Sequence, residues 1–287
     1  MKTDSSAQSY SPLSTEGIPA RQFRVKILSH PYQLSCLLVL VSMLVTLLIW
    51  QGATSIFGMP AFILPTPRQV FIRWWSVVTD GSLINHLLIT LSEVLLGLMT
   101  GSFTASVIGY LLAKSRLLER IVAPYLVASQ AVPVVAIAPL LVIWFGPGLF
   151  SKILICALIV FFPVLVNTVV GLRAVPENLR DLMRSMRATN WQMLWYLEVP
   201  AALPVFLGGL RVGATLSVIG AVVGEFVGAD RGLGFLINVG RGQYDTALVF
   251  VAILTLVVMA LSLYGCVVLL ERRLLSWQAR SQMDEGI

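Results

Sequence analysis

Residues 177–204 read ENLRDLMRSMRATNWQMLWYLEVPAALP and interrupt a chain that is otherwise dominated by strongly hydrophobic sequence. Four apolar residues of this stretch recur at helical spacing: Leu179, Leu182, Met183 and Met186. Three basic residues lie elsewhere on the same predicted helix surface: Arg180, Arg184 and Arg187. The pattern predicts an amphipathic helix that does not cross a bilayer. It either docks a partner outside the lipid or lies on anionic lipid.

The rest of the chain has the composition of a polytopic membrane protein. Of its 287 residues, 57% are hydrophobic and 12% are charged, whereas soluble domains have about 25% charged residues. Five runs without Asp, Glu, Lys or Arg predict membrane spans: 27–67, 94–113, 121–151, 153–172 and 246–270. A sixth span over about 201–227 contains Arg211 and Glu225. We therefore expect an all-α membrane protein whose six-helix domain covers 31–275.

The distribution of basic residues predicts the orientation. Fourteen of the 20 Lys and Arg residues fall in the two tails and in the 114–120 and 173–200 loops; five fall on the opposite side, and Arg211 lies within a span. This bias places both termini and the 173–200 loop in the cytoplasm of a bacterial cell with an inner membrane. It also accounts for the net charge of +6 without a nucleic-acid partner.

The two ends of the chain differ from the hydrophobic domain. Residues 1–30 are polar and rich in Ser and Thr, and we expect them to form a disordered cytoplasmic tail without a cleavable signal peptide. Residues 276–287 are expected to form a second cytoplasmic tail.

The residues needed for catalysis by this chain are missing from the sequence. None of its four lysines follows a glycine, so the Gly-Lys pair of a phosphate-binding loop is absent. The two histidines, His30 and His86, are far apart and have no nearby cysteine, so no metal site is expected. We expect no catalytic residue and no cofactor bound by this chain.

The amphipathic stretch has recognisable helix boundaries. Pro176 suits the start of a helix, and Glu177 and Asp181 favour its positive amino end. Thr189 or Asn190 can cap a second short helix, which should end before Pro200.

Small and polar residues within the predicted spans give further candidates. Small residues recur every three or four positions along the fifth of these spans in chain order, 201–227, and predict a groove for helix packing or for a dimer: Gly209, Gly213, Ser217, Gly220, Gly224 and Gly228. Four polar residues are candidates for a translocation path: Glu93, Glu225, Gln130 and Asn167. Alternatively, the two glutamates reach interfacial water, and Gln130 and Asn167 form hydrogen bonds between helices. In the outer loop, Asp230 and Arg231 are either a docking site for a binding protein or simply solvated.

The 177–204 stretch resembles the cytoplasmic EAA loop of permease subunits from binding-protein-dependent ABC importers. Asp181 takes the acidic position of that loop, Leu182 and Met183 take the two alanine positions, and Arg187 stands where the family usually has glycine. The resemblance extends over roughly 60–277 through Leu64–Pro67, the 131–146 segment, Phe162-Pro163 and the GADRGLG sequence at 228–234. Together these motifs are similar to the nitrate, sulfonate and taurine subgroup, which includes permeases for vitamin precursors.

The resemblance implies a type I importer permease (MetI-like) fold, a set of partners and a set of coupling residues. The implied partners are two cytoplasmic ATPase subunits that bind ATP and Mg, an extracytoplasmic solute-binding protein and a second copy of this chain. The residues implied to contact the ATPase are Glu177, Asp181, Leu182, Met183, Arg184, Ser185, Met186, Arg187 and Ala188.

The solute is less closely defined by the sequence. Arg211 is the sole base expected at membrane depth, so an anion would find little countercharge, and we favour a vitamin or precursor of the riboflavin or pyrimidine type. A sulfonate, taurine or nitrate importer is the alternative within the class. A proton-coupled secondary transporter using Glu93 and Glu225 is the rival class, and a membrane scaffold or enzyme component is a third.

Overall fold

The computed structural model describes residues 31–56 and 58–275, with side chains from residue 38 onward, and every regular element among them is a helix. The expected tails, 1–30 and 276–287, lie outside the described residues. The chain divides into two units, residues 1–49 and 50–287. Among the described residues, five helices are long and apolar enough to cross a membrane, and a bent helix pair can provide a sixth span. The expected all-α membrane fold is confirmed.

The first helix, α1 (Pro31–Ile56), crosses the boundary between the two units. Its 26 residues are enough to span the hydrocarbon layer, which needs about 20. Just inside the second unit, the indole of Trp50 donates a hydrogen bond to the Pro65 carbonyl (3.1 Å) and stacks on Phe250.

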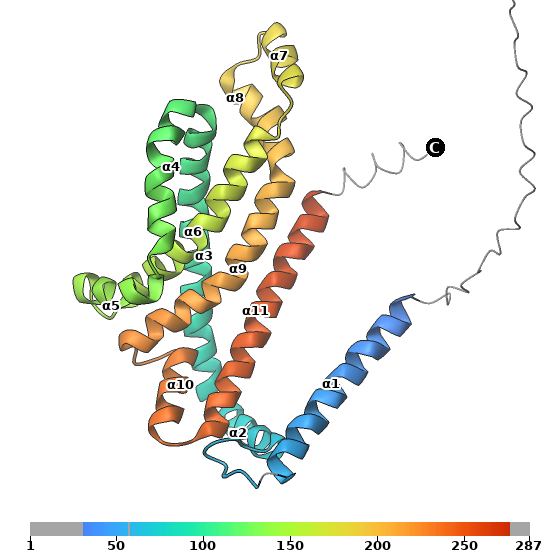
Figure 1. Ribbon diagram of the computed structural model, residues 1–287, viewed down its shortest axis with the longest axis vertical. Helices are drawn as coiled ribbons and strands as arrows, with labels where there is room; N and C mark the ends of the chain where they lie inside the picture. The colour runs from blue at the N-terminus through green and yellow to red at the C-terminus, as the bar shows by residue number, and fades with distance from the viewer. Residues whose placement is uncertain (1–30, 57, 276–287) are drawn as a thin grey trace, which may run out of the picture. The chain divides into compact units, whose positions relative to one another are not determined.

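Four long helices form the centre of the second unit: α3 (Ser82–Lys114), α6 (Leu149–Arg173), α9 (Val199–Gly228) and α11 (Thr246–Leu274). Helix α6 packs against both α3 and α9, and α11 packs against α9 (Figure 1). A Cβ at Gly220 of α9 would lie 2.8 Å from the Cys156 Cα, and one at Gly101 of α3 would lie 2.7 Å from the Ala157 carbonyl oxygen. Glycine therefore allows both helices to approach the α6 backbone.

The predicted small-residue groove of α9 faces α6 along most of its length. Gly209 meets Asn167, Gly213 meets Val160, and Gly224 meets Lys152. Gly228 lies further along, next to Pro147 and Val142. The groove is occupied by helix packing within the chain.

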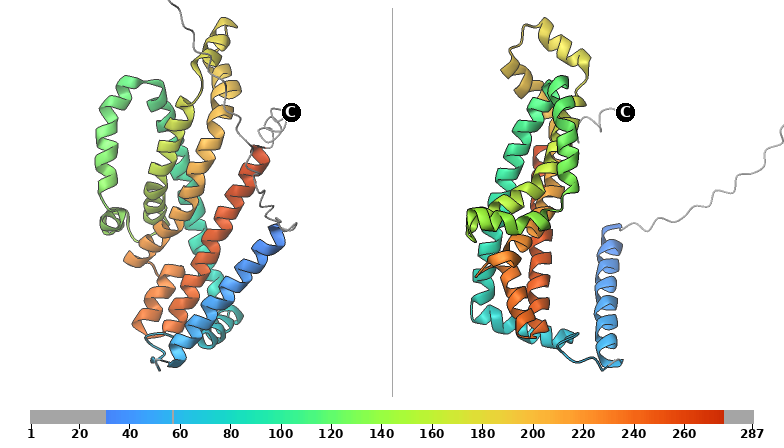
Figure 2. Two further views of the ribbon diagram at one scale, coloured as in Figure 1. Left: turned by 45° about the vertical axis from the view of Figure 1, so that its right-hand side comes forward. Right: turned by 60° about the vertical axis from the view of Figure 1, so that its left-hand side comes forward.

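The expected 121–151 span is broken. Helices α4 (Arg116–Ala131) and α5 (Val134–Phe145) meet at an angle of 94°, and the bend is visible in Figure 2. Pro133 lacks an N–H and holds Val132 in an extended conformation, which ends α4. The next span, α6, then begins at Leu149.

Three shorter helices lie at the ends of the bundle. Helices α2 (Pro67–Thr79) and α10 (Leu233–Gly242) lie at one end, and α7 (Glu177–Ser185) lies at the other (Figure 1). Thr66 and Gln69 form a capping box at the start of α2.

Two helix boundaries differ from the sequence-based expectation. Helix α3 begins twelve residues before the uncharged run, because Glu93 is accommodated inside it. The short helix capped by Thr189, α8 (Asn190–Met193), does not end before Pro200 but continues through a π-helical turn, η1 (Leu194–Glu198), into α9. In that turn the Val199 N–H bonds to the Leu194 carbonyl, and the shifted hydrogen bonds accommodate the proline in the first turn of α9.

Candidate functional site

Helix α7 projects from one end of the bundle with its apolar face uncovered. No side chain of α7 is buried, and Leu179, Leu182 and Met186 are 40%, 56% and 71% exposed. On the polar side, an Arg184 guanidinium nitrogen lies 3.0 Å from Asp181 Oδ1. An apolar helix face left open in this way is typical of a surface that binds a partner.

The end of α7 explains the unusual arginine at 187. The Ala188 N–H bonds to the Met183 carbonyl (3.0 Å), and the Arg187 N–H bonds to the Arg184 carbonyl (2.9 Å). These two bonds form a Schellman motif, whose penultimate residue adopts the left-handed conformation; here Arg187 has φ = 55°. The turn is therefore the one that glycine favours, and it forms with arginine in the glycine position. The helix itself ends at Ser185, three residues before the predicted end of the coupling segment.

A buried carboxylate fixes the base of α7 to the bundle. Glu198 is 1% exposed and accepts a hydrogen bond from the Lys114 ammonium of α3 at 2.7 Å. The Arg180 Nε of α7 lies 3.8 Å from the same oxygen, and another Arg180 nitrogen donates to the Leu172 carbonyl at 2.6 Å. Glu198 thus joins α7, α3 and the start of α9. This anchor was not predicted from the sequence, because Lys114 lies 84 residues away and no local spacing connects the two.

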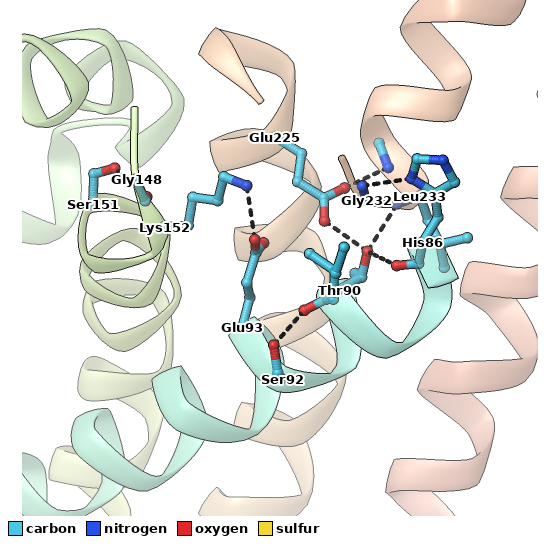
Figure 3. Close-up of polar contacts among 12 residues, drawn as sticks. His86, Thr90, Ser92, Glu93, Gly148, Ser151, Lys152, Glu225, Gly232 and Leu233 are labelled. Atoms are coloured by element: carbon cyan, nitrogen blue, oxygen red, sulfur yellow. Dashed lines mark hydrogen bonds and ion pairs between the residues drawn. The ribbon is translucent and has the colours of Figure 1, made fainter. Parts of the chain in front are cut away.

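A second polar cluster lies inside the bundle near the opposite end, between α3, α6 and α9 (Figure 3). The Lys152 ammonium donates a hydrogen bond to Glu93 at 2.8 Å, and the two side chains are 7% and 1% exposed. The neighbouring Glu225 is fully buried and accepts a hydrogen bond from the Thr90 hydroxyl at 2.6 Å.

This cluster also holds the start of α10. Three successive backbone N–H groups donate to side chains: Gly232 to His86 Nδ1 (2.9 Å), Leu233 to the Thr90 oxygen (2.8 Å) and Gly234 to Glu225. A Cβ at either glycine would collide with the Glu225 carboxylate, and Gly232 also has a φ of 117°. The GADRGLG sequence therefore reads as a loop shaped around a buried carboxylate.

The structure corrects two expectations about these charges. Glu93 and Glu225 do not reach interfacial water, because each is at most 1% exposed and both are enclosed by packed helices. Arg211 is not the sole base at membrane depth, because Lys152 is buried there as the partner of Glu93. Arg211 itself pairs with Glu271 of α11 and lies over the Tyr264 ring, 5.5 Å from its centroid.

The other candidate residues are spread over the fold. Gln130 is exposed near the end of α4. Asn167 of α6 donates to the Pro163 carbonyl within its own helix at 2.8 Å. Asp230 and Arg231 are exposed in the loop before α10, at the end of the bundle opposite α7. The structure does not bring these four residues into one site.

A bundle of membrane-length helices with an anchored, uncovered amphipathic helix at one end is the fold of a multi-pass membrane protein. Residues 97–276 match the family described as "Binding-protein-dependent transport system inner membrane component", and the chain belongs to that family.

Three named transport permeases are similar in sequence to most of this chain. The chain is 47% identical to the riboflavin transport system permease protein RibX of Chloroflexus aurantiacus, over 83% of this chain and 89% of that protein. It is 36% identical to the formylaminopyrimidine transport permease protein ThiX of Halalkalibacterium halodurans, over 83% and 94%. It is 34% identical to the putative aliphatic sulfonates transport permease protein SsuC of Bacillus subtilis, over 82% and 85%.

A solved structure supports the same fold. The MetNI methionine ABC transporter in an inward-facing conformation matches with a TM-score of 0.59 and 19% identity, over 68% of this chain and 97% of that chain. The protein is thus a multi-pass inner-membrane permease subunit of an ABC importer, with the MetI-type fold. It is a transport subunit and not an enzyme, since ATP hydrolysis in such importers belongs to a separate ATPase chain.

Proposed function

We propose that two copies of this chain form the membrane pathway of the importer and that each copy docks one ATPase subunit on α7. The observation that carries this assignment is the uncovered apolar face of α7, held on the bundle by the buried Glu198. In this arrangement the partner subunits bind ATP and Mg, and both termini of the permease are cytoplasmic. The excess of Lys and Arg on the α7 side supports that orientation.

Energy transfer then follows from the way α7 is attached. Closure of the ATPase subunits displaces α7, and the Glu198 anchor transmits the displacement to α3 and α9. The pathway alternates between two arrangements, and ATP binding supplies the free energy that shifts their populations.

Two exposed surfaces fit the remaining partners, a second copy of this chain and a solute-binding protein. At the carboxyl end of α5, Ile143, Trp144 and Phe145 are exposed at 74%, 67% and 50%, and a second copy would cover such side chains. At the other end of the bundle, the exposed Asp230 and Arg231 offer charges of both signs to a solute-binding protein.

The docking of α7 can be tested by exchanging its surface charges. The double variant Asp181→Arg/Arg184→Glu keeps an ion pair at the same spacing but reverses the charges offered to the ATPase. We expect it to insert normally, to lose the co-purifying ATPase and to lose ATP-driven uptake in vesicles. Arg272→Gln/Arg273→Gln, which removes two exposed charges from the end of α11, is the control. Uptake that persists in the α7 variant, or uptake driven by a proton gradient without ATP, would contradict the proposal and favour a secondary transporter.

For the solute, we propose a vitamin or vitamin precursor of the riboflavin or pyrimidine type. The support comes from the similarity to RibX and ThiX over most of the chain. In addition, the Lys152 and Arg211 charges are taken up by Glu93 and Glu271, so neither base is available to hold a sulfonate.

The cognate binding protein offers the most direct test of the solute. Its thermal unfolding should be measured with riboflavin, a formylaminopyrimidine, taurine and an alkanesulfonate. We expect a rise in its Tm with one of the first two compounds. A rise only with taurine or the alkanesulfonate would assign the importer to the sulfonate group instead.

A further inference from the structure

A basic pocket of about 450 Å³ lies at the base of α7, next to the Glu198 anchor, with which it shares Lys114 and Arg180. The ends of α3 and α6 and the starts of α4 and α7 form its walls. Five basic side chains line the pocket: Lys114, Arg116, Arg120, Arg173 and Arg180. Only two carboxylates, Glu119 and Glu177, line it with them.

Three of the five bases already have partners inside the chain. Arg173 forms a two-armed ion pair with Glu119, while Lys114 and Arg180 are held by Glu198 and the Leu172 carbonyl as described above. Arg116 and Arg120, by contrast, are exposed and have no carboxylate within 4.0 Å in the part of the chain that the structure describes. The pocket therefore has two guanidinium groups available for an external anion.

The position of the pocket favours a membrane lipid as the source of that anion. Lys114 and Arg173 are the last residues of two membrane-length helices, so the pocket lies at the depth of the lipid headgroups. Guanidinium groups match the geometry of phosphate oxygens, and basic pockets between helices at a membrane surface bind anionic headgroups.

Helix α4 also provides a surface for an acyl chain. Leu117, Ile121 and Tyr125 follow one another at one-turn spacing and are 70%, 56% and 74% exposed. This apolar row lies beside the row that holds Arg116 and Arg120, and it continues away from the pocket along the helix. The basic row at the headgroup level can bind a phosphate, and the apolar row extends further along α4, where an acyl chain can lie. The two rows together complement an anionic phospholipid.

We propose that the pocket binds the phosphate of an anionic phospholipid, with one acyl chain along the apolar row of α4. Because Glu177 and Arg180 of the first turn of α7 belong to the pocket wall, the bound headgroup contacts the base of that helix. The lipid site does not depend on the proposed solute, and its binding can be measured without ATP.

The test compares two double variants of the full chain, purified with its ATPase in mild detergent. Arg116→Gln/Arg120→Gln removes the two available guanidinium groups; Arg272→Gln/Arg273→Gln removes two exposed charges from the end of α11. Bound lipid is measured by native mass spectrometry during titration with phosphatidylglycerol, with phosphatidylcholine and with inorganic phosphate. We expect the wild type and the α11 variant to retain phosphatidylglycerol, and the α4 variant to bind it about 30-fold more weakly, from roughly fivefold for each base near an anionic lipid.

Four results would overturn the proposal. Equal losses in both variants would indicate general surface attraction, and unchanged binding in the α4 variant would remove the site. Equal retention of phosphatidylcholine, or displacement of the lipid by inorganic phosphate at the same concentration, would show that the site does not select an anionic lipid. Arg116→Lys/Arg120→Lys keeps both charges and should recover most of the binding, which separates loss of the site from a folding defect.

Discussion

The anchor of α7 makes a quantitative prediction for Glu198→Gln. The substitution keeps the size of the side chain but removes the charge that Lys114 and Arg180 share. A hydrogen bond to a charged group contributes about 1.5–3 kcal/mol, and we expect a value near the lower end because Lys114 is 41% exposed and can turn to water. A loss of about 2 kcal/mol lowers the equilibrium ratio of anchored to released α7 by roughly 30-fold.

The assay measures ATP-driven uptake and ATP hydrolysis in parallel, using the reconstituted complex. We expect uptake by the Glu198→Gln variant to fall by about 30-fold at most, while the ATPase stays bound and continues to hydrolyse ATP. Glu271→Gln is the matched control, since it removes the carboxylate of an ion pair between α9 and α11 that makes no described contact with α7. Normal uptake by the Glu198 variant, or an equal loss in the control, would refute the view that Glu198 transmits force.

Three further variants test other parts of the fold. Arg187→Gly should stabilise the turn after α7 by about 1 kcal/mol, because glycine adopts the left-handed conformation without strain; slower hydrogen exchange there, absent in Arg187→Ala, would show it. Lys152→Met leaves the buried Glu93 carboxylate without its partner and should cost about 3–5 kcal/mol, measured as a lower Tm in detergent, and adding Glu93→Gln should restore most of it. If Lys152→Met/Glu93→Gln has no higher Tm than Lys152→Met, the unpaired Glu93 carboxylate does not cause the loss of stability. Gly220→Ala brings a methyl group against the Cys156 backbone and should lower the Tm, whereas Gly208→Ala, with no atom within 4 Å of its added Cβ, should not.

The sequence was sufficient for features that depend on local composition. Long uncharged runs predicted the spans around α6 and α11, because a membrane-crossing helix must be apolar along its whole length. The 3/4 spacing of residues 179–186 predicted α7, and one of the two candidate caps of the next helix, Thr189, is the cap of α8. The break at Pro133 could be anticipated as a kink, but its 94° angle depends on how α5 packs.

The missing parts all depend on partners that are distant in sequence. The Lys152–Glu93 pair joins residues 59 positions apart, and Thr90 reaches Glu225 across 135 positions. Once such pairs form, a charged residue no longer marks the end of a span, which is why α3 extends well before residue 94. Considered singly, each of these charged residues would be costly inside a membrane span, whereas in the fold they are partners of one another.

The three captured N–H groups at the start of α10 have a mechanical consequence. His86 and Thr90 lie one turn apart on α3, so a rotation of α3 about its axis would release Gly232 and Leu233 together. Together with Glu225 on α9, they make α3, α9 and α10 a single rigid block. Helix α4, by contrast, has no buried side chain and ends at a sharp break. We therefore expect α3, α9 and α10 to move as one body when α7 is displaced, and the α4–α5 elbow to bend at Pro133 relative to them.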